Sequence, residues 1–314
     1  MKAITQDVYG TADVLRYADV DVPTPGPGEV LIKVRAAGVD YGVWHQMTGL
    51  PLISRLGFGV SRPKTAVPGM DVAGVVEAAG ADVTRFRAGD EVFGSASGSF
   101  AEYAVASPKK LAHKPAGLTF EQAGALGVSG CTALKALAGL RTGQSVLVIG
   151  ASGGVGSFAV QLAKLLGAGQ VTGVCSTAKL DFVRSLGADQ VIDYTREPIS
   201  GRHDLILDIG GNRTLAELRR CLTGHGTLVV VGGENGGRVT GGIGRSMLRA
   251  PLLGMFTRQK LRGLLSLVRG GDLERLAELG VKPAIERSYP LADAADAVRH
   301  LTAGRTRGKL VITM

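Results

Sequence analysis

The segment 146–164, VLVIGASGGVGSFAVQLAK, carries the strongest structural signal in this sequence. It begins with an apolar run that is typical of a buried strand. Four glycines follow within seven residues, at Gly150, Gly153, Gly154 and Gly156, and then an apolar-periodic stretch that is typical of a helix. In a doubly wound parallel sheet, a glycine turn between a strand and a helix is the usual phosphate site for a dinucleotide. The segment therefore predicts a doubly wound α/β domain with a dinucleotide at this turn.

The turn carries the dinucleotide fingerprint G-x-G-x-x-G with one change, because Ala151 replaces its first glycine. We expect Gly153 to let the backbone approach a pyrophosphate, and the last glycine of the turn to let the helix lie close to the strand. Ala151 requires that the turn avoid backbone angles that only glycine tolerates well. The predicted cofactor contacts here are Ala151, Ser152, Gly153, Gly154 and Val155. A turn that serves only tight packing is the alternative.

The end of the next strand indicates which dinucleotide binds. An NAD site places an acidic residue there, to bond the ribose 2′-hydroxyl. This strand ends VTGVCSTAK, and no carboxylate follows before Asp181, which lies inside the next predicted helix. Ser176 and Thr177 offer hydroxyls, Lys179 offers a cation, and Tyr194 adds a hydroxyl after the third strand. These residues favour NADP(H). A surface role for Lys179 and a packed aromatic at Tyr194 are the alternatives.

The pattern of the chain predicts two domains. The first 120 or so residues read as short strands punctuated by glycine and proline, as in a barrel-like β domain. From Thr119, a plausible helix N-cap, one helix is expected, and strands then alternate with helices as in a parallel sheet. We predict a β domain at residues 1–122, completed by 266–314, and a dinucleotide-binding domain at 123–265.

Composition excludes several classes of function. The chain has 314 residues, of which 45% are hydrophobic and 20% charged, enough to bury two ordinary cores. The net charge is +9, but Lys and Arg are dispersed without aromatic interleaving, which argues against a nucleic-acid partner. The densest basic segment, 245–269, alternates with leucines. It is expected to be a solvated helix face, with a basic rim around an anionic ligand as the alternative.

The sequence also bears on location. It has no apolar run of about 18 residues, so no membrane span is expected. The three cysteines, Cys131, Cys175 and Cys221, are too few and too scattered for a disulfide framework or a CxxC zinc site. We read Cys131 and Cys175 as small buried residues. A reduced, cytoplasmic location is expected.

Several motifs together carry a family resemblance: GEVLIKVRAAGV, VPGMDVAGVVEAAG, FRAGDEVFG, GASGGVG, AKLDFVRSLGADQVIDY and GRTRGKLVITM. The chain resembles the medium-chain dehydrogenase/reductase superfamily and, within it, the zinc-independent, zeta-crystallin-like quinone oxidoreductases. The resemblance runs over essentially the whole chain. It implies an N-terminal GroES-like β domain completed by the C-terminal tail, a Rossmann domain that binds NADP(H), and a homodimer.

The resemblance also bears on metal. Zinc-dependent members have a cysteine where this chain has Asp40, and a His-Glu pair where it has Met70 and Asp71. Their third ligand, a cysteine, falls at about Val128. Methionine and valine are not credible zinc ligands here, so the site is expected to be free of metal. Without a Lewis acid, the expected reaction is reduction of an acceptor that is already electrophilic.

By this resemblance, NADPH passes hydride to a quinone. The alternatives are an enone, alkenal or enoyl reductase and, in a different class, a non-catalytic NADPH-binding sensor or structural protein. Asp40 and Tyr41 are the candidate catalytic residues, and Trp44 and His45 are expected to shape the substrate wall. Water is the alternative proton donor, and Tyr41 would then only line the pocket. The family usually has asparagine at the Asp40 position and often aspartate at Val43. Asp40 is therefore an acid, a hydrogen-bond acceptor for the ribose, or a turn residue.

The same resemblance implies further cofactor contacts. They are Thr132, Gly210, Gly232, Gly233, Phe256 and Lys309. Lys309 is expected to reach the cofactor from the C-terminal tail. For Thr132 the alternative is a hydroxyl that bonds its own helix backbone, and for Phe256 it is a place in the core.

Overall fold

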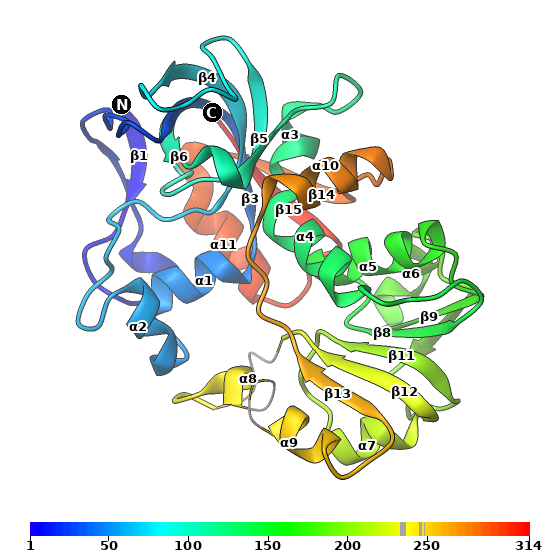
Figure 1. Ribbon diagram of the computed structural model, residues 1–314. Coiled ribbons are helices and arrows are strands. Elements are labelled where there is room, and N and C mark those ends of the chain that lie inside the picture. The colour runs from blue at the N-terminus through cyan, green and yellow to red at the C-terminus, as the bar shows by residue number, and fades with distance from the viewer. Residues whose placement is uncertain (233–236, 245–246, 248) are drawn as a thin grey trace. The chain divides into compact units, whose positions relative to one another are not determined.

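A computed structural model describes residues 1–314 except 233–236, 245–246 and 248. The chain has the predicted α/β fold and divides into two compact units (Figure 1). The first unit comprises Met1–Cys131 and Leu267–Met314, and the second comprises Thr132–Ser266. Compared with the predicted boundaries, residues 123–131 lie with the first unit and residue 266 lies with the second.

The first unit is built on a mostly antiparallel sheet. Its strand order is β14-β15-β3-β4-β5-β7, and β6 pairs with β3. The strands are β3 (Val30–Val39), β4 (Asp71–Ala79), β5 (Glu91–Ser95), β6 (Tyr103–Ala106), β7 (Leu111–His113), β14 (Ile285–Pro290) and β15 (Lys309–Thr313). A separate two-stranded sheet joins β1 (Lys2–Thr5) to β2 (Arg16–Asp19). The helices are α1 (Tyr41–Thr48), α2 (Arg55–Phe58), α3 (Phe120–Gly124), α10 (Gly270–Glu278) and α11 (Ala294–Thr302).

Strand β15 sets the register that matters for the site. It pairs antiparallel with β3, so that Leu310 lies opposite Val39. Lys309, the first residue of β15, is thereby brought beside Asp40, which directly follows β3. On the other side β3 pairs with β4, which begins at Asp71. Three charged residues distant in sequence therefore meet at one end of three neighbouring strands.

The single helix expected from Thr119 is two helices. Thr119 does cap α3, through a capping box with Gln122. The helix then breaks, and α4 begins at Gly127 and ends at Ala136. The carboxylate of Asp71 lies at this break and accepts a hydrogen bond from the backbone N–H of Val128 at 2.6 Å. A buried acceptor from the sheet thus satisfies a first-turn donor of the second helix, which local sequence does not reveal.

The second unit holds a six-stranded parallel sheet. Its order is β10-β9-β8-β11-β12-β13. The strands are β8 (Ser145–Ile149), β9 (Gln170–Cys175), β10 (Gln190–Asp193), β11 (His203–Asp208), β12 (Leu222–Val230) and β13 (Lys260–Gly263). The helices are α5 (Gly154–Leu165), α6 (Leu180–Ser185), α7 (Leu215–Arg220), α8 (Gly241–Gly244) and α9 (Ala250–Gly254). In Figure 1, α5 and α6 lie on one face of this sheet and α7 and α9 on the other.

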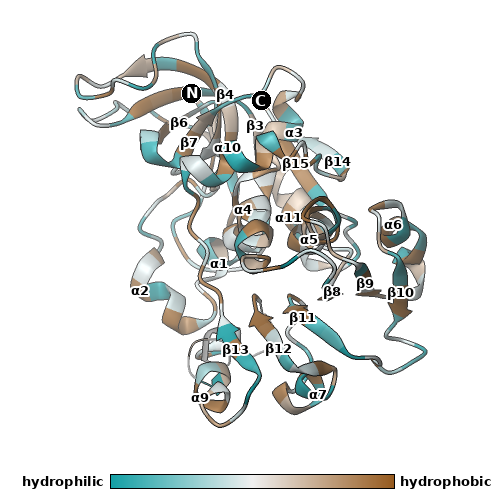
Figure 2. Ribbon diagram, turned by 45° about the vertical axis from the view of Figure 1, so that its right-hand side comes forward, coloured by the Kyte–Doolittle hydropathy of each residue, from teal (hydrophilic) through white to brown (hydrophobic). Residues whose placement is uncertain are grey.

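The central strands are buried on both faces, as a covered parallel sheet requires. In β8 and β9 only the first residue of each strand is partly exposed. Figure 2 shows the hydrophobic colour on both of these strands. Leu147, Ile149, Ile206 and Leu228 belong to one buried cluster, which packs against Leu218 of α7. Because all the strands are parallel, their carboxyl ends share one edge of the sheet.

The expectation of a helix face over the basic segment 245–269 is confirmed for only a short stretch of its described part. Only Ala250–Gly254 is α-helical, and Lys260–Gly263 forms the edge strand β13. Leu261 pairs with Leu228 of β12 and is buried in the core of the second unit. Burial of this leucine in the sheet overrides the helix-like spacing of the leucines around it.

Candidate active site

The glycine turn follows β8 at the carboxyl edge of the parallel sheet. Gly150 has a φ of 83°, in the left-handed region that glycine tolerates. Ala151 does not have a positive φ, since every described residue with one is a glycine. The expectation that the turn spares Ala151 such an angle is confirmed. The left-handed backbone angle of the turn lies at Gly150, one residue before the substituted position.

Gly156 and Gly153 differ in the space that a side chain would have at each position. A Cβ at Gly156 would lie 2.1 Å from the carbonyl oxygen of Gly150, so a side chain there would force the helix away from the strand. A Cβ at Gly153 would meet only the same oxygen, at 3.6 Å, which is an ordinary contact. Packing within the protein therefore requires glycine at 156 but not at 153. The space beside Gly153 is open to a ligand such as a pyrophosphate.

The start of α5 completes this cradle. Gly153 is the N-cap residue, and no hydrogen bond from a described side chain caps the helix. The first backbone N–H groups of a helix have no partner within the helix and carry a partial positive charge. Here those groups belong to Gly154, Val155 and Gly156. They present donors to an anion, as a dinucleotide phosphate site requires.

The neighbouring strand end lies beside the turn. The backbone N–H of Gly210 donates to Ile149 at 3.3 Å, which brings the end of β11 against the end of β8. Gly232 donates to the backbone of Asp208 at 3.3 Å and so follows at the end of β12. The structure thus brings the turn, Gly210 and Gly232 to one edge. Gly233 lies outside the described residues.

Asp193, the last residue of β10, places a carboxylate beside the end of β9, which the sequence analysis did not predict. Thr177 donates its hydroxyl hydrogen bond to Asp193, and Asp193 also accepts from the hydroxyl of Thr195 at 2.6 Å. These bonds, that of Thr177 above all, lower the pKa of Asp193. Arg196 lies 3.6 Å from the same carboxylate. The NAD fingerprint places its acidic residue at the end of the second strand, whereas Asp193 ends the third strand, where it pairs with Cys175.

The remaining predicted contacts of the second unit differ in exposure. Tyr194 is 44% exposed beside the end of β9, which does not fit a packed aromatic. Phe256 is 79% exposed, so the alternative of a core residue is wrong. Thr132, in α4, is buried. Cys175 is buried, which raises the pKa of its thiol to about 11, so the thiol stays protonated at neutral pH.

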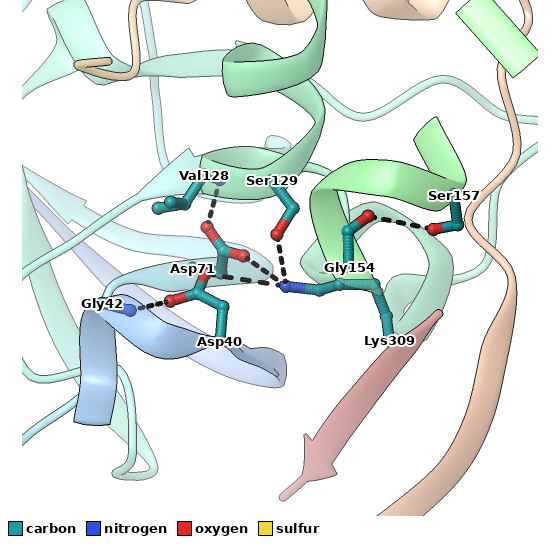
Figure 3. A network of polar contacts seen from close by, with 8 residues as sticks. All are labelled: Asp40, Gly42, Asp71, Val128, Ser129, Gly154, Ser157 and Lys309. Carbon is teal, nitrogen blue, oxygen red and sulfur yellow. Dashed lines mark hydrogen bonds and ion pairs between the residues drawn. The ribbon is translucent and has the colours of Figure 1, made fainter. Parts of the chain in front are cut away.

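In the first unit, the ammonium of Lys309 lies between two carboxylates (Figure 3). Its Nζ is 3.3 Å from Oδ2 of Asp71 and 3.6 Å from Oδ2 of Asp40. It also donates to the hydroxyl of Ser129 at 3.3 Å. The side chain of Lys309 is only 1% exposed and that of Asp71 is fully buried. The sequence placed Lys309 at the cofactor and did not foresee this cluster. That cofactor contact stays a prediction.

Asp40 links the cluster to α1. Its Oδ1 accepts from the backbone N–H of Gly42 at 2.8 Å and caps the helix, while its Oδ2 faces Lys309. Of the roles left open for Asp40, the structure shows that of a turn residue and adds an ion pair. Its side chain, 9% exposed, is the most exposed of the three charged members.

Asp71 is the deepest acid of the cluster. Burial raises its pKa to about 7, and the charge of Asp40 adds to that rise, whereas Lys309 and the N–H of Val128 oppose it. The cluster therefore gains or loses a proton near neutral pH. In the sequence, the signal was an acidic residue at the start of an otherwise apolar strand, DVAGVV, which requires a buried partner.

Three side chains with aromatic rings, Tyr41, Trp44 and His45, lie in α1 directly after Asp40. The rings of Tyr41 and Trp44 meet edge to face with centroids 6.3 Å apart, and those of Trp44 and His45 with centroids 5.0 Å apart. Tyr41 and Trp44 pack against the core of the unit. A ring nitrogen of His45 hydrogen-bonds the carbonyl of Leu50. This bond holds the imidazole against its own loop and occupies Nδ1.

Comparison with known proteins identifies the family. Residues 26–116 match the alcohol dehydrogenase GroES-like domain, and residues 186–312 match the zinc-binding dehydrogenase domain. Quinone-oxidoreductase QR1 of Triphysaria versicolor is 33% identical over 339 residues, which cover 99% of this chain and 98% of that protein. The chain belongs to the quinone oxidoreductases of the medium-chain dehydrogenase/reductase superfamily. The predicted GroES-like and Rossmann architecture is confirmed.

Two further relatives widen the picture of the family. The 2-methylene-furan-3-one reductase of Solanum lycopersicum is 35% identical over 99% of this chain and 79% of that protein. A mycobacterial protein solved in complex with NADPH has a TM-score of 0.83 at 28% identity, with 100% of both chains covered. As a family member, the protein is an oxidoreductase that uses a nicotinamide cofactor and a small-molecule substrate. None of the helices in the described part of the chain is long and apolar enough to span a membrane.

The zinc named in the second domain match does not fit the residues present. Among the described residues, no three His, Cys, Asp or Glu side chains gather as a metal site. Between Asp40 and Asp71 lies the ammonium of Lys309, a cation built into the chain. Val128 contributes a backbone N–H that points at Asp71, and an N–H is a donor, not a metal ligand.

Two alanine substitutions test the division of work in the glycine turn. Gly156→Ala should destabilise the protein by about 1–3 kcal/mol, because its Cβ would overlap a backbone oxygen. Gly153→Ala should cost less stability but weaken NADPH binding more, since its Cβ fills the ligand space. Urea unfolding and NADPH titration of both variants measure this. The reverse order of effects would contradict the assignment.

The raised pKa of Asp71 predicts a pH dependence of stability. The folded state holds this proton more tightly than the unfolded chain, whose aspartate has a pKa of about 4. The contribution is therefore complete below about pH 4 and is lost as the pH rises through about 7. Asp71→Asn should flatten the decline in stability between about pH 5 and 8. The fluorescence of Trp44, the single tryptophan, reports unfolding of the first unit.

Asp181→Asn is the matched control, because its side chain is fully exposed. It should keep the slope of the unmodified protein. Equal slopes for Asp71→Asn and the unmodified protein would show that Asp71 does not titrate in this range.

Proposed function

We propose that the protein transfers hydride from NADPH to a quinone without a metal ion. The observation that carries the proposal is the turn after β8, where Gly153 leaves space that protein packing does not need. The quinone oxidoreductases among its relatives support the choice of acceptor. When bound, NADPH supplies the hydride, that is, two electrons and one hydrogen nucleus. A quinone then needs one proton to become a hydroquinone.

The choice of NADPH over NADH rests on the edge formed by β9 and β10. Ser176 offers a hydroxyl, Lys179 a cation and Tyr194 an exposed phenol to a 2′-phosphate, whereas the hydroxyl of Thr177 already donates to Asp193. The carboxylate of Asp193 lies at the same edge, but its oxygens are engaged by the hydroxyls of two threonines and the charge of Arg196. The mycobacterial relative solved with NADPH supports the same choice.

The residues of the first unit are proposed to supply the proton. Asp40 is the partly exposed end of a cluster that exchanges a proton near neutral pH, and Tyr41 follows it in sequence. Proton release from this cluster leaves both carboxylates charged, and the ammonium of Lys309 between them stabilises that state. Trp44 and His45 then form a wall beside this acid, in keeping with a flat acceptor.

Reduction of an enone is the second candidate, and the similarity to the 2-methylene-furan-3-one reductase of Solanum lycopersicum supports it. Both reactions use the same hydride donor and differ in whether the hydride and proton end on oxygen or carbon. A homodimer and a cytoplasmic location, both expected from the sequence, stay predictions.

The decisive experiment follows NADPH oxidation by the purified protein. The acceptors are 9,10-phenanthrenequinone, a simple benzoquinone and an alkyl enone. We expect turnover with a quinone to exceed turnover with the enone. A preference for the enone would support the second candidate, whereas tight NADPH binding without turnover on any acceptor would support a sensor or structural role.

Charge reversal at Lys179 tests the cofactor choice. Lys179→Glu should weaken NADPH binding by roughly tenfold or more, because a charge-assisted contact to the 2′-phosphate becomes a repulsion. NADH binding should change little. Asp193→Asn should leave NADPH binding unchanged or tighten it, since a negative charge near the phosphate is removed. Fluorescence titration with both cofactors measures these effects.

Lys260→Glu is the control for a general loss of positive charge. It makes the same change of charge on an exposed residue at the amino end of β13. This strand lies at the other side of the sheet from β10. An equal loss of NADPH affinity in Lys179→Glu and Lys260→Glu would remove Lys179 from the site.

A further inference from the structure

A hollow with three arginines in its lining lies in the second unit. It has a volume of about 410 Å³, and its lining includes Ala216, Arg219, Arg220, Thr257, Arg258 and Gln259. Arg220 is the last residue of α7, after which β12 begins, and Arg258 and Gln259 directly precede β13. The hollow is therefore at the amino ends of β12 and β13. The glycine turn lies at the carboxyl edge of the same parallel sheet, so the two are separate.

Gln259 gives the hollow a fixed wall. Its side-chain NH₂ donates to the backbone carbonyls of Arg219 at 3.0 Å and Thr223 at 3.4 Å. Its Oε1 accepts from Nε of Arg219 at 3.0 Å, and the hydroxyl of Thr257 donates to its backbone carbonyl at 3.0 Å. The guanidinium of Arg219 is thereby held by Nε. Within the described part of the chain, its terminal nitrogens have no recorded partner.

The positive charge of the hollow is not balanced within it. Arg219, Arg220 and Arg258 line it, and none of the described lining residues is acidic. The nearest acid along α7, Glu217, accepts hydrogen bonds from the backbone and hydroxyl of Thr214, both at 2.8 Å. These hydrogen bonds, and after them the charges of Arg213 and Arg220, lower the pKa of Glu217, so its carboxylate offsets part of the charge of Arg220 but lies outside the lining of the hollow.

Two of these arginines have a simpler explanation, because cations at a helix C-terminus interact favourably with the helix dipole. That accounts for Arg219 and Arg220 as surface residues of α7. It does not account for Arg258, which comes from a different segment, nor for the glutamine that holds Arg219. Two separate segments of the chain thus place arginines around one hollow.

We propose that this hollow binds a small multivalent oxyanion of the phosphate class, independently of the dinucleotide. Guanidinium groups pair with phosphate oxygens through two parallel hydrogen bonds, and three of them suit a doubly or triply charged group. The volume falls within the usual range for small-molecule sites, about 300–1,000 Å³. The basic residues converge on a hollow and form no stripe, which favours a small molecule over a nucleic acid.

Inorganic pyrophosphate is the probe. The full-length protein is first saturated with NADPH, so that the turn after β8 is filled, and is then titrated with pyrophosphate at low ionic strength in a calorimeter. The double variant Arg220→Ala/Arg258→Ala removes two charges but spares Arg219, which bonds Gln259. We expect binding to the unmodified protein and at least about tenfold weaker binding to the double variant. Pyrophosphate should also raise the Tm of the unmodified protein alone of these two.

Arg141→Ala is the matched control, because Arg141 is exposed in the turn before β8, at the same edge of the sheet but outside the hollow. It should bind pyrophosphate like the unmodified protein. Inorganic phosphate and adenosine diphosphate then distinguish a free anion from a phosphorylated metabolite. Absence of heat and of a Tm shift, or equal binding by the double variant, would overturn the proposal and would leave the reductase activity unaddressed.

Discussion

A buried ammonium between two carboxylates holds the first unit together at the point where its chemistry is expected. Lys309 comes from the last strand, Asp71 from the start of β4 and Asp40 from the residue after β3, while Ser129 comes from α4. Removing one partner of such a buried pair leaves an uncompensated charge, which typically costs about 3–5 kcal/mol. The first unit is therefore stable only when β15 is paired in the sheet, because this strand supplies Lys309.

The same interaction links packing to proton chemistry. At the break between α3 and α4, the carboxylate of Asp71 accepts a hydrogen bond from the backbone N–H of Val128. The same carboxylate also accepts a hydrogen bond from the ammonium of Lys309. A helix N-terminus, a strand end and a buried cation thus share one carboxylate. Burial raises the pKa of Asp71 and the charge of Lys309 lowers it. Because these two effects oppose each other, the pKa of Asp71 is about 7. Such a balance suits a group that must give up a proton at neutral pH.

The second unit depends on a different constraint, the parallel order of its strands. Parallel strands place all their carboxyl ends at one edge, and the tight approach at Gly156 sets α5 against β8 there. Gly210 and Gly232 arrive at that edge from two other strands. Asp193 arrives in the same way, from the third strand in sequence rather than the second. The amino edge receives the arginines of α7 and of the segment before β13, so the two edges differ in the ligands they suit.

Local spacing and backbone sterics were enough to predict the α/β class, the place of the glycine turn and the freedom of Ala151 from a left-handed angle. The sequence also indicated Thr119 as a helix cap. Three features became evident only in the folded chain: the helix break after α3, the strand β13 within the segment 245–269, and the position of Lys309 between two carboxylates. These features arise from pairing between residues far apart in the chain. No local pattern encodes which buried acceptor or strand edge a segment will meet.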